Sequence, residues 1–277
     1  LTPQPIEEKR PDPDKDVRNV SLRKFSDGLK EVSGKRGALF IDQFDPYLAM
    51  MLRERGSNPA AFIGGGDAVH PGPAGHTLMA WAVLKGLGAG ALVSRAEIDG
   101  GAGKVASTEC CAVENLRVAD GIVSFDRRDE ALPMPIDPRA KAALKLAPVL
   151  GDLNRYELCV SGLSAAEYEV KIDGESVGKI SRETLANGWN LADEAGPITR
   201  QSRKVLDLVF QKNDLFFRRW REVQLHVLPG WAQNPASEEG RRGELASIDQ
   251  RIADLEAQIN NARQPASHRF ELAPVAR

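Results

Sequence analysis

The sequence predicts a mixed α/β protein in three consecutive segments: an α/β segment over residues 1–89, an antiparallel β module over 90–182 and a helical hairpin region over 183–277. Three patterns predict this order. In the first segment apolar residues recur every three or four positions, which indicates helices, around one short apolar run. Short apolar runs separated by Gly or Asp turns then predict antiparallel strands. Apolar residues at helical spacing return in the last segment.

The composition is that of an ordinary globular protein, with 42% hydrophobic and 27% charged residues. The formal net charge of −2 and the lack of an Arg and Lys stripe with interleaved aromatic residues argue against a nucleic-acid partner. No apolar run approaches the roughly 18 residues of a membrane span, and no Cys or His spacing predicts a metal or another cofactor. The cysteines, Cys110, Cys111 and Cys159, are expected as small buried thiols on strands, although a bond from Cys159 to either of the others stays open.

The first segment opens on a proline-rich stretch, Leu1–Asp16, which predicts a surface loop. A helix with one buried face is expected next, because apolar residues recur at spacings of three and four until Gly34 and Gly37 end the pattern. These apolar residues are Leu22, Phe25, Leu29 and Val32. The run Ala38–Asp42 is continuous and apolar, which is typical of a strand buried on both faces of a parallel sheet.

Two more helices complete this segment. Asp45 and Pro46 predict a helix start, with the Asp as the cap and the proline in the first helical position. A glycine-rich loop over 64–76 follows, and apolar residues from Leu78 to Leu84 mark the next helix. Helices alternating with a short strand indicate a layered α/β protein. A sheet needs more than one strand, so we expect further strands outside this sequence.

The β module is predicted from short apolar runs with turn residues between them. Hairpin turns are expected at Asp99–Gly101, Ala119–Gly121 and Asp173–Gly174, because Gly and Asp adopt the backbone angles of tight turns. The segment Ala131–Pro135 carries two prolines and is expected to cross in a rigid extended form. No cluster of titratable residues stands out here, which favours a structural or binding module.

The last segment is predicted to form a helical hairpin. A wide apolar stripe runs from Val205 to Val223 and stops before Pro229. The second helix carries apolar residues at alternating spacings of three and four, which is the pattern of a coiled-coil seam. The seam residues are Leu245, Ile248, Ile252, Leu255 and Ile259. The seam is barely three heptads long, which favours packing against the chain's own core over a dimerising coiled coil.

The glycine-rich loop carries the candidate catalytic residues, Asp67 and His70. Glycines let the backbone turn sharply, so residues three apart can converge. A carboxylate bonded to one imidazole nitrogen leaves the other nitrogen free to accept a proton, and it stabilises the imidazolium that forms. The spacing alone is a weak signal, because an Asp-x-x-His sequence is more often a loop with a capping Asp.

The sequence around this pair is more specific. Asp-x-x-His-Pro from Asp67, followed by Gly-His at His76 and an apolar helix, resembles the final block of the SGNH (GDSL-type) hydrolases. The resemblance implies that residues 1–89 are the C-terminal part of a three-layer α/β/α sandwich. It implies that Asp67 and His70 belong to a Ser-His-Asp triad, that His76 is structural, and that the protein is periplasmic or secreted. The later segments are similar to a C-terminal extension of some bacterial members.

Two motifs of this family do not occur in the sequence. They are the Gly-Asp-Ser motif of the nucleophile and the Gly-x-Asn-Asp motif of the oxyanion hole; Ser26 precedes Asp27 and Gly28 in the wrong order. We expect both motifs upstream of Leu1, which is not a natural first residue. The implied activity is that of a serine ester hydrolase acting on acyl or acetyl esters, including carbohydrate esters. The present chain by itself is expected to hydrolyse no ester.

A non-catalytic function is also compatible with these residues. The β module and the hairpin make up most of the chain, and the nucleophile is absent from it. A carbohydrate-binding or scaffolding protein derived from a hydrolase therefore stays open. The expected partner is a small-molecule or carbohydrate ester for the enzyme and a polysaccharide for the binding protein. Neither alternative calls for a cofactor, and the oligomeric state is not predicted.

Overall fold

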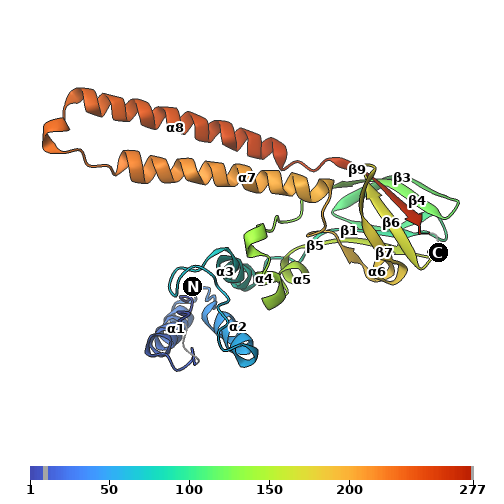
Figure 1. The fold of residues 1–277 in the computed structure, drawn as a ribbon, viewed down its shortest axis with the longest axis horizontal. Coiled ribbons are helices and arrows are strands. Elements are labelled where there is room, and N and C mark those ends of the chain that lie inside the picture. Colours follow the sequence, from blue (N-terminus) through green and yellow to red (C-terminus); the bar gives the residue numbers. More distant parts are fainter. Residues whose placement is uncertain (9–11, 276–277) are drawn as a thin grey trace. The chain divides into compact units, whose positions relative to one another are not determined.

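The computed structural model describes residues 1–8 and 12–275, and its fold is mixed α/β as the sequence predicts (Figure 1). The chain divides into two compact units. Unit 1 comprises Leu1–Val93 and Ile136–Tyr156, and unit 2 comprises Ser94–Pro135 and Glu157–Arg277. The chain therefore passes between the units three times, which differs from the three consecutive segments that we expected.

Unit 1 is built mainly of helices, which are α1 (Val17–Arg36), α2 (Phe44–Ser57), α3 (Pro73–Gly86), the short turn η1 (Pro138–Ala140), α4 (Ala143–Leu146) and α5 (Val149–Leu153). The last three come from a stretch that we assigned to the β module. Their place follows from bonds between α5 and α3: the Asp152 carboxylate accepts from Trp81 Nε1 at 3.0 Å and from Lys85 Nζ at 2.7 Å.

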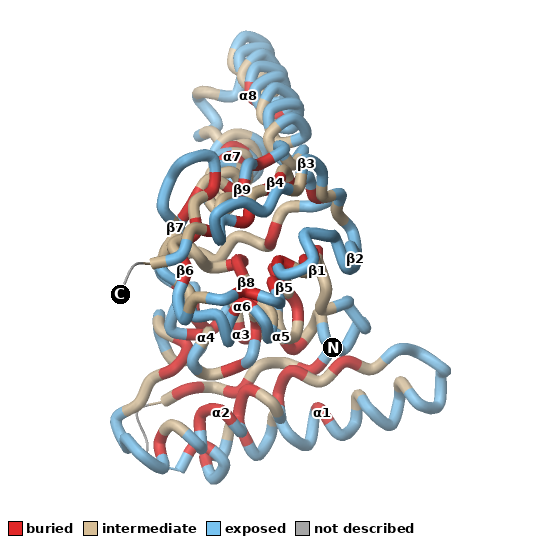
Figure 2. The backbone as a smooth tube through the Cα atoms, turned by 90° about the vertical axis from the view of Figure 1, so that its right-hand side faces the viewer, coloured by how far each residue is buried: buried red, intermediate tan, exposed pale blue. Residues whose placement is uncertain are grey.

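The helix α1 does not bury the apolar face that its sequence predicts. Phe25 and Val32 are 59% and 58% exposed, and α1 is pale blue along most of its length in Figure 2. The helix is held instead through a polar side chain, because Asn19 Nδ2 donates to the carbonyl oxygens of Ile6 and Pro13. Leu22 and Leu29 of the same face are only half-buried, so the predicted burial is incomplete in the described structure.

The strand expected at Ala38–Asp42 is also not formed within the described residues. This stretch is extended but joins no sheet, and one backbone bond, from Thr2 N to the Ile41 oxygen at 3.1 Å, ties it to a distant segment. An apolar run becomes a buried strand only where neighbouring strands complete its ladder. The following helix starts at Phe44 rather than at Pro46, because the Asp42 carboxylate accepts from the Phe44 N–H at 2.9 Å.

Unit 2 contains two sheets, with strand orders β2-β1-β5-β8 and β3-β4-β9-β6-β7. The strands are β1 (Leu92–Asp99), β2 (Lys104–Glu109), β3 (Cys111–Ala119), β4 (Ile122–Asp129), β5 (Arg155–Ser161), β6 (Glu167–Ile172), β7 (Glu175–Ser181), β8 (Trp189–Asn190) and β9 (Ser267–Pro274). The three predicted hairpin turns are confirmed between β1 and β2, β3 and β4, and β6 and β7. At two of them Asp120 and Asp173 have the positive φ angles, 53° and 54°, of tight hairpin turns.

The strand β9 lies in the middle of the larger sheet, between β4 and β6. Leu272 pairs with Val123 on one side and with Val170 on the other. The rings of Phe125 and Phe270 stack in the core with centroids 5.1 Å apart. The region expected as a separate hairpin from residue 183 therefore supplies strands to the β module, because β8 and β9 both follow that boundary.

The helical hairpin is present as α7 (Pro197–Phe217) and α8 (Pro235–Ala262), after the short α6 (Arg182–Asn187). A π-helical segment, Arg218–Gln224 (η2), and a short turn, Gly230–Ala232 (η3), lie between them. The seam of α8 packs against α7 through a buried cluster of Leu215, Ile248 and Ile252, which confirms packing within the chain. None of the helices in the described part of the chain is long and apolar enough to cross a bilayer.

Candidate functional site

The loop between α2 and α3 brings Asp67 and His70 together, as the sequence predicts. His70 Nδ1 lies 2.9 Å from Asp67 Oδ2 and 3.2 Å from Oδ1. The backbone N–H groups of Val69 and His70 donate to Asp67 Oδ1 at 2.8 and 2.7 Å. One carboxylate therefore fixes both the turn of the loop and the orientation of the imidazole ring.

Glycines shape the backbone beneath this pair. Gly65 and Gly66 have φ angles of 64° and 75°, a left-handed conformation that side chains rarely adopt. The Asp67 N–H donates back to the His70 oxygen at 3.1 Å, and a Cβ atom on Gly66 would overlap that same oxygen. The Gly64 oxygen accepts from the Gly72 N–H at 3.0 Å, which closes the base of the loop.

Glu7 anchors the loop, and sequence reasoning missed it. This buried carboxylate accepts from the N–H groups of Ile63 and Gly64 at 2.6 and 2.8 Å, and the Glu7 N–H donates to the Ala68 oxygen at 2.9 Å. Burial raises the pKa of Glu7, while the two backbone donors and Arg55 act in the opposite direction. Nothing in the sequence distinguishes Glu7 from the other charged residues of the stretch Leu1–Asp16, which we predicted as a surface loop. Thr2 and Pro5 in that stretch are also buried, so the prediction of a surface loop is only partly correct.

The helices α2 and α3 clamp the other side of the loop. The Tyr47 hydroxyl of α2 is packed so closely on Gly64 that a Cβ atom there would overlap it. A Cβ atom on Gly75 of α3 would lie 2.8 Å from the Tyr47 oxygen and 3.0 Å from Gly64 Cα. Burial raises the pKa of Tyr47, and the charge of Glu7 acts in the same direction. Glycine at both positions lets the two helices approach the loop.

The electrostatics of the pair suit a proton acceptor. The backbone N–H of His70, its ring and the N–H of Val69 together lower the pKa of Asp67 to about 2, so this carboxylate is ionised at neutral pH. An ionised Asp67 selects the His70 tautomer with the proton on Nδ1, which leaves Nε2 as the acceptor. The His70 side chain is 83% exposed. Among the described residues, only Asp67 bonds to this ring.

The other candidate residues lie apart from this pair. His76 is exposed on the first turn of α3, and its ring enters no hydrogen bond with another described residue, so its structural role stays a prediction. Cys110, Cys111 and Cys159 are free thiols. Cys159 is buried on β5 as expected, whereas Cys110 is exposed between β2 and β3 and Cys111 is only half-buried, so the burial expected for these two is wrong. Within residues 1–8 and 12–275, no three His, Cys, Asp or Glu side chains are grouped to hold a metal ion.

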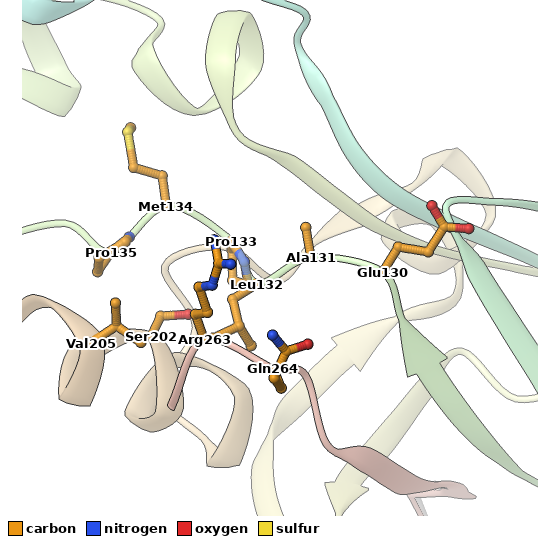
Figure 3. Close-up of a pocket in the computed structure, with 10 residues that line it drawn as sticks. All are labelled: Glu130, Ala131, Leu132, Pro133, Met134, Pro135, Ser202, Val205, Arg263 and Gln264. Atoms are coloured by element: carbon orange, nitrogen blue, oxygen red, sulfur yellow. The ribbon is translucent and has the colours of Figure 1, made fainter. Parts of the chain in front are cut away.

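Unit 2 contains a separate pocket of about 460 Å³ (Figure 3). One wall is the extended segment 130–135, and the other comes from α7 and the end of α8. The lining residues are Glu130, Ala131, Leu132, Pro133, Met134, Pro135, Ser202, Val205, Arg263 and Gln264. These side chains include no aromatic ring on which a sugar could stack, so the pocket gives no support to carbohydrate binding.

Comparison with known proteins adds one similarity. No protein-family model matches the chain, and no curated protein matches it significantly. Among solved structures, the fold is similar to that of a gut microbial diltiazem-metabolizing enzyme, with a TM-score of 0.78 and 24% sequence identity. The similarity covers 99% of this chain and 71% of that one. At this level of identity the likeness shows a shared fold.

Proposed function

We propose that this chain carries the Asp and the His of a Ser-His-Asp triad in an ester hydrolase of the SGNH type. The observation that carries the proposal is the bond from His70 Nδ1 to Asp67, on a loop whose backbone is fixed by the same carboxylate. The similar structure belongs to an enzyme described as metabolizing diltiazem, a compound that contains an ester group. The family resemblance of the loop supports small acyl or acetyl esters as substrates and export as the destination.

The proposed reaction uses His70 as base and then as acid. His70 Nε2 takes the proton of a serine hydroxyl while the serine oxygen bonds to the ester carbonyl carbon. The tetrahedral intermediate collapses, the bond to the alcohol oxygen breaks, and His70 returns the proton to that oxygen. Water then attacks the acyl-serine with its proton passing to His70, and the released serine oxygen recovers that proton as the acid leaves. Asp67 stabilises the imidazolium in both halves.

The serine of this triad is proposed to lie outside the 277 residues. The described structure places no serine, threonine or cysteine in a bond with the His70 ring, and the sequence contains no Gly-Asp-Ser motif. The exposed side chains of Phe25 and Val32 on α1 and of Leu39 in the extended stretch Ala38–Asp42 are apolar surface that further strands and helices of an α/β sandwich would cover. The chain also spans 71% of the similar solved chain, which leaves room for such elements.

Substitution of Asp67 tests the triad in the protein with its natural flanking sequence. Asp67→Asn is expected to lower kcat for p-nitrophenyl acetate by about 10³–10⁴-fold, because the amide favours the wrong imidazole tautomer. The matched control is Asp45→Asn, a surface acid of α2 that pairs with Arg23, and it should leave kcat unchanged. Unchanged hydrolysis in Asp67→Asn would refute the assignment. The isolated 277-residue chain is expected to show no turnover that depends on His70.

A further inference from the structure

The connection between α7 and α8 exposes an unusual number of large apolar side chains. We call residues 216–234 the hairpin tip; in Figure 1 they lie at the end of the hairpin farthest from the strands of unit 2. Val227 and Trp231 are 81% and 88% exposed. The exposed apolar residues of the tip are Phe216, Phe217, Trp220, Leu225, Val227 and Trp231.

The exposed area of the tip has the size of a protein interface. If each of these large side chains carries roughly 200 Å², a value within the range for aromatic residues, their exposed fractions add up to about 700 Å². A standard interface buries about 800 Å² on each partner. The summed exposed apolar area of the tip therefore approaches the area that one partner buries in a standard interface.

The charged residues of the tip indicate what kind of surface covers it. Arg218 and Arg219 pair with acids of α8, whereas Arg221 and Glu222 enter no ion pair with the residues that the structure describes. In a two-fold contact the same patch of each copy faces the other. Two residues of opposite charge in that patch can therefore form an ion pair between the copies at two places, because each residue faces its counterpart on the second copy. Adjacent unpaired charges of opposite sign suit such a contact. An anionic lipid surface would attract Arg221 but repel Glu222.

We propose that the hairpin tip is a dimerisation surface and that its occupant is the tip of a second copy of this chain. The tip contains exposed Trp, Phe and Arg side chains, which are residue types enriched at protein interfaces. The seam of α8 is not the contact, because Ile248 and Ile252 are already buried against α7. The dimer forms through the turn, with Arg221 of each copy beside Glu222 of the other. This inference is independent of the proposed hydrolase activity.

Light scattering after size-exclusion chromatography of the 277-residue chain tests the proposal. The expected mass is twice the 30.2 kDa of one chain. The double variant Val227→Glu/Trp231→Glu should raise the dissociation constant by about 100-fold or more, because it places four like charges in the contact. Both residues are highly exposed, so folding should be unaffected. The matched control is Val118→Glu on β3, an exposed valine outside the tip, which should leave the mass of the dimer unchanged.

A charge exchange tests the two-fold arrangement itself. Arg221→Glu and Glu222→Arg should each weaken the dimer by about tenfold, and combining them should restore it. A single-chain mass at about 100 μM protein, well above the Kd of a stable dimer, would overturn the proposal. So would a dimer that survives Val227→Glu/Trp231→Glu, or a combined charge variant that stays weak. A monomer that sediments with phosphatidylglycerol vesicles would identify the tip as a lipid-binding surface instead.

Discussion

Asp67 has two roles in its loop, and each uses a different part of the carboxylate. Oδ1 accepts two backbone N–H groups, while Oδ2 makes the shorter bond to the His70 ring. Sequence spacing predicts the second role, because residues three apart on a turn converge. It does not predict Glu7 or Tyr47, which hold the loop from positions far away along the chain.

The low pKa of Asp67 predicts how the pair responds to acid. Its folded value of about 2 lies below the ordinary value of 3.8, so the folded chain binds this proton less tightly than the unfolded chain. The ionised carboxylate therefore stabilises the fold above about pH 4, and this contribution is lost as the pH falls toward 2. Between about pH 4 and 8 Asp67 should not titrate.

Carbon-13 NMR titration of the Asp67 carboxyl checks this expectation. The wild-type midpoint should lie at about 2. In His70→Gln the midpoint should rise, because the ring bond is lost, yet it should stay below 3.8 because the backbone N–H groups remain. A wild-type midpoint at the ordinary value would contradict the geometry of the loop.

Truncation of the Glu7 side chain should destabilise the loop that carries Asp67 and His70, although Glu7 bonds to neither of their side chains. Glu7→Ala leaves the buried N–H groups of Ile63 and Gly64 unpaired, at a cost of about 1–3 kcal/mol each. The free energy of unfolding should fall by about 2–6 kcal/mol, and the amide of Gly64 should exchange faster with deuterium. The control is Glu8→Ala, whose partner Arg18 is on the surface; it should cost less than about 1 kcal/mol. Equal losses of unfolding free energy in Glu7→Ala and Glu8→Ala would contradict the anchoring role of Glu7.

At the scale of elements, the sequence predicts what is decided locally. The turns at Asp120 and Asp173 are correct because Asp-Gly specifies a hairpin within a few residues. The apolar run Ala38–Asp42 and the strand β9 are different cases, because their fate depends on partners that are distant in sequence. The stretch Ala38–Asp42 bonds to Thr2 and joins no sheet. The strand β9 lies between β4 and β6, which precede it in the sequence by about a hundred residues or more.

A buried ion pair links the two sheets of unit 2. The side chains of Arg127 and Asp129 are 0% and 1% exposed. Arg127 donates to the Asp129 carboxylate at 2.9 Å, to Ser94 Oγ at 3.0 Å and to the Glu157 oxygen at 3.0 Å. Ser94 also donates to Asp129. Ser94 on β1 and Glu157 on β5 belong to the four-stranded sheet, whereas Arg127 and Asp129 lie on β4 of the five-stranded sheet. These hydrogen bonds therefore hold the two sheets together.

Removal of one member of this network should destabilise unit 2 strongly. Asp129→Ala leaves the Arg127 charge buried without its carboxylate, which costs about 3–5 kcal/mol. Asp126→Ala removes an acid from the opposite face of the same strand, where its partner Arg269 is partly exposed, and should cost less than about 1 kcal/mol. Urea denaturation measures both. Similar midpoints for the two variants would contradict the proposed importance of the buried pair.

At the scale of the whole molecule, the predicted class is correct, whereas the contact-defined units differ from the predicted segments. Composition and periodicity identify the main helices and the antiparallel strands, but they do not reveal the short helices of 138–153 or that 136–156 returns to unit 1. That return depends on bonds such as the one from Trp81 to Asp152, which no local pattern encodes. The same limit applies to the catalytic apparatus, for which the sequence offers two residues and the loop that holds them.

Covalent labelling tests most directly whether those two residues act with a serine from outside this chain. The protein with its natural flanking sequence is treated with a fluorophosphonate, and the modified peptide is located by mass spectrometry. We predict one labelled serine outside residues 1–277, with labelling slowed by about 10³-fold or more in His70→Gln, because His70 activates that serine. A label within residues 1–277, or labelling that is unchanged in His70→Gln, would contradict the account.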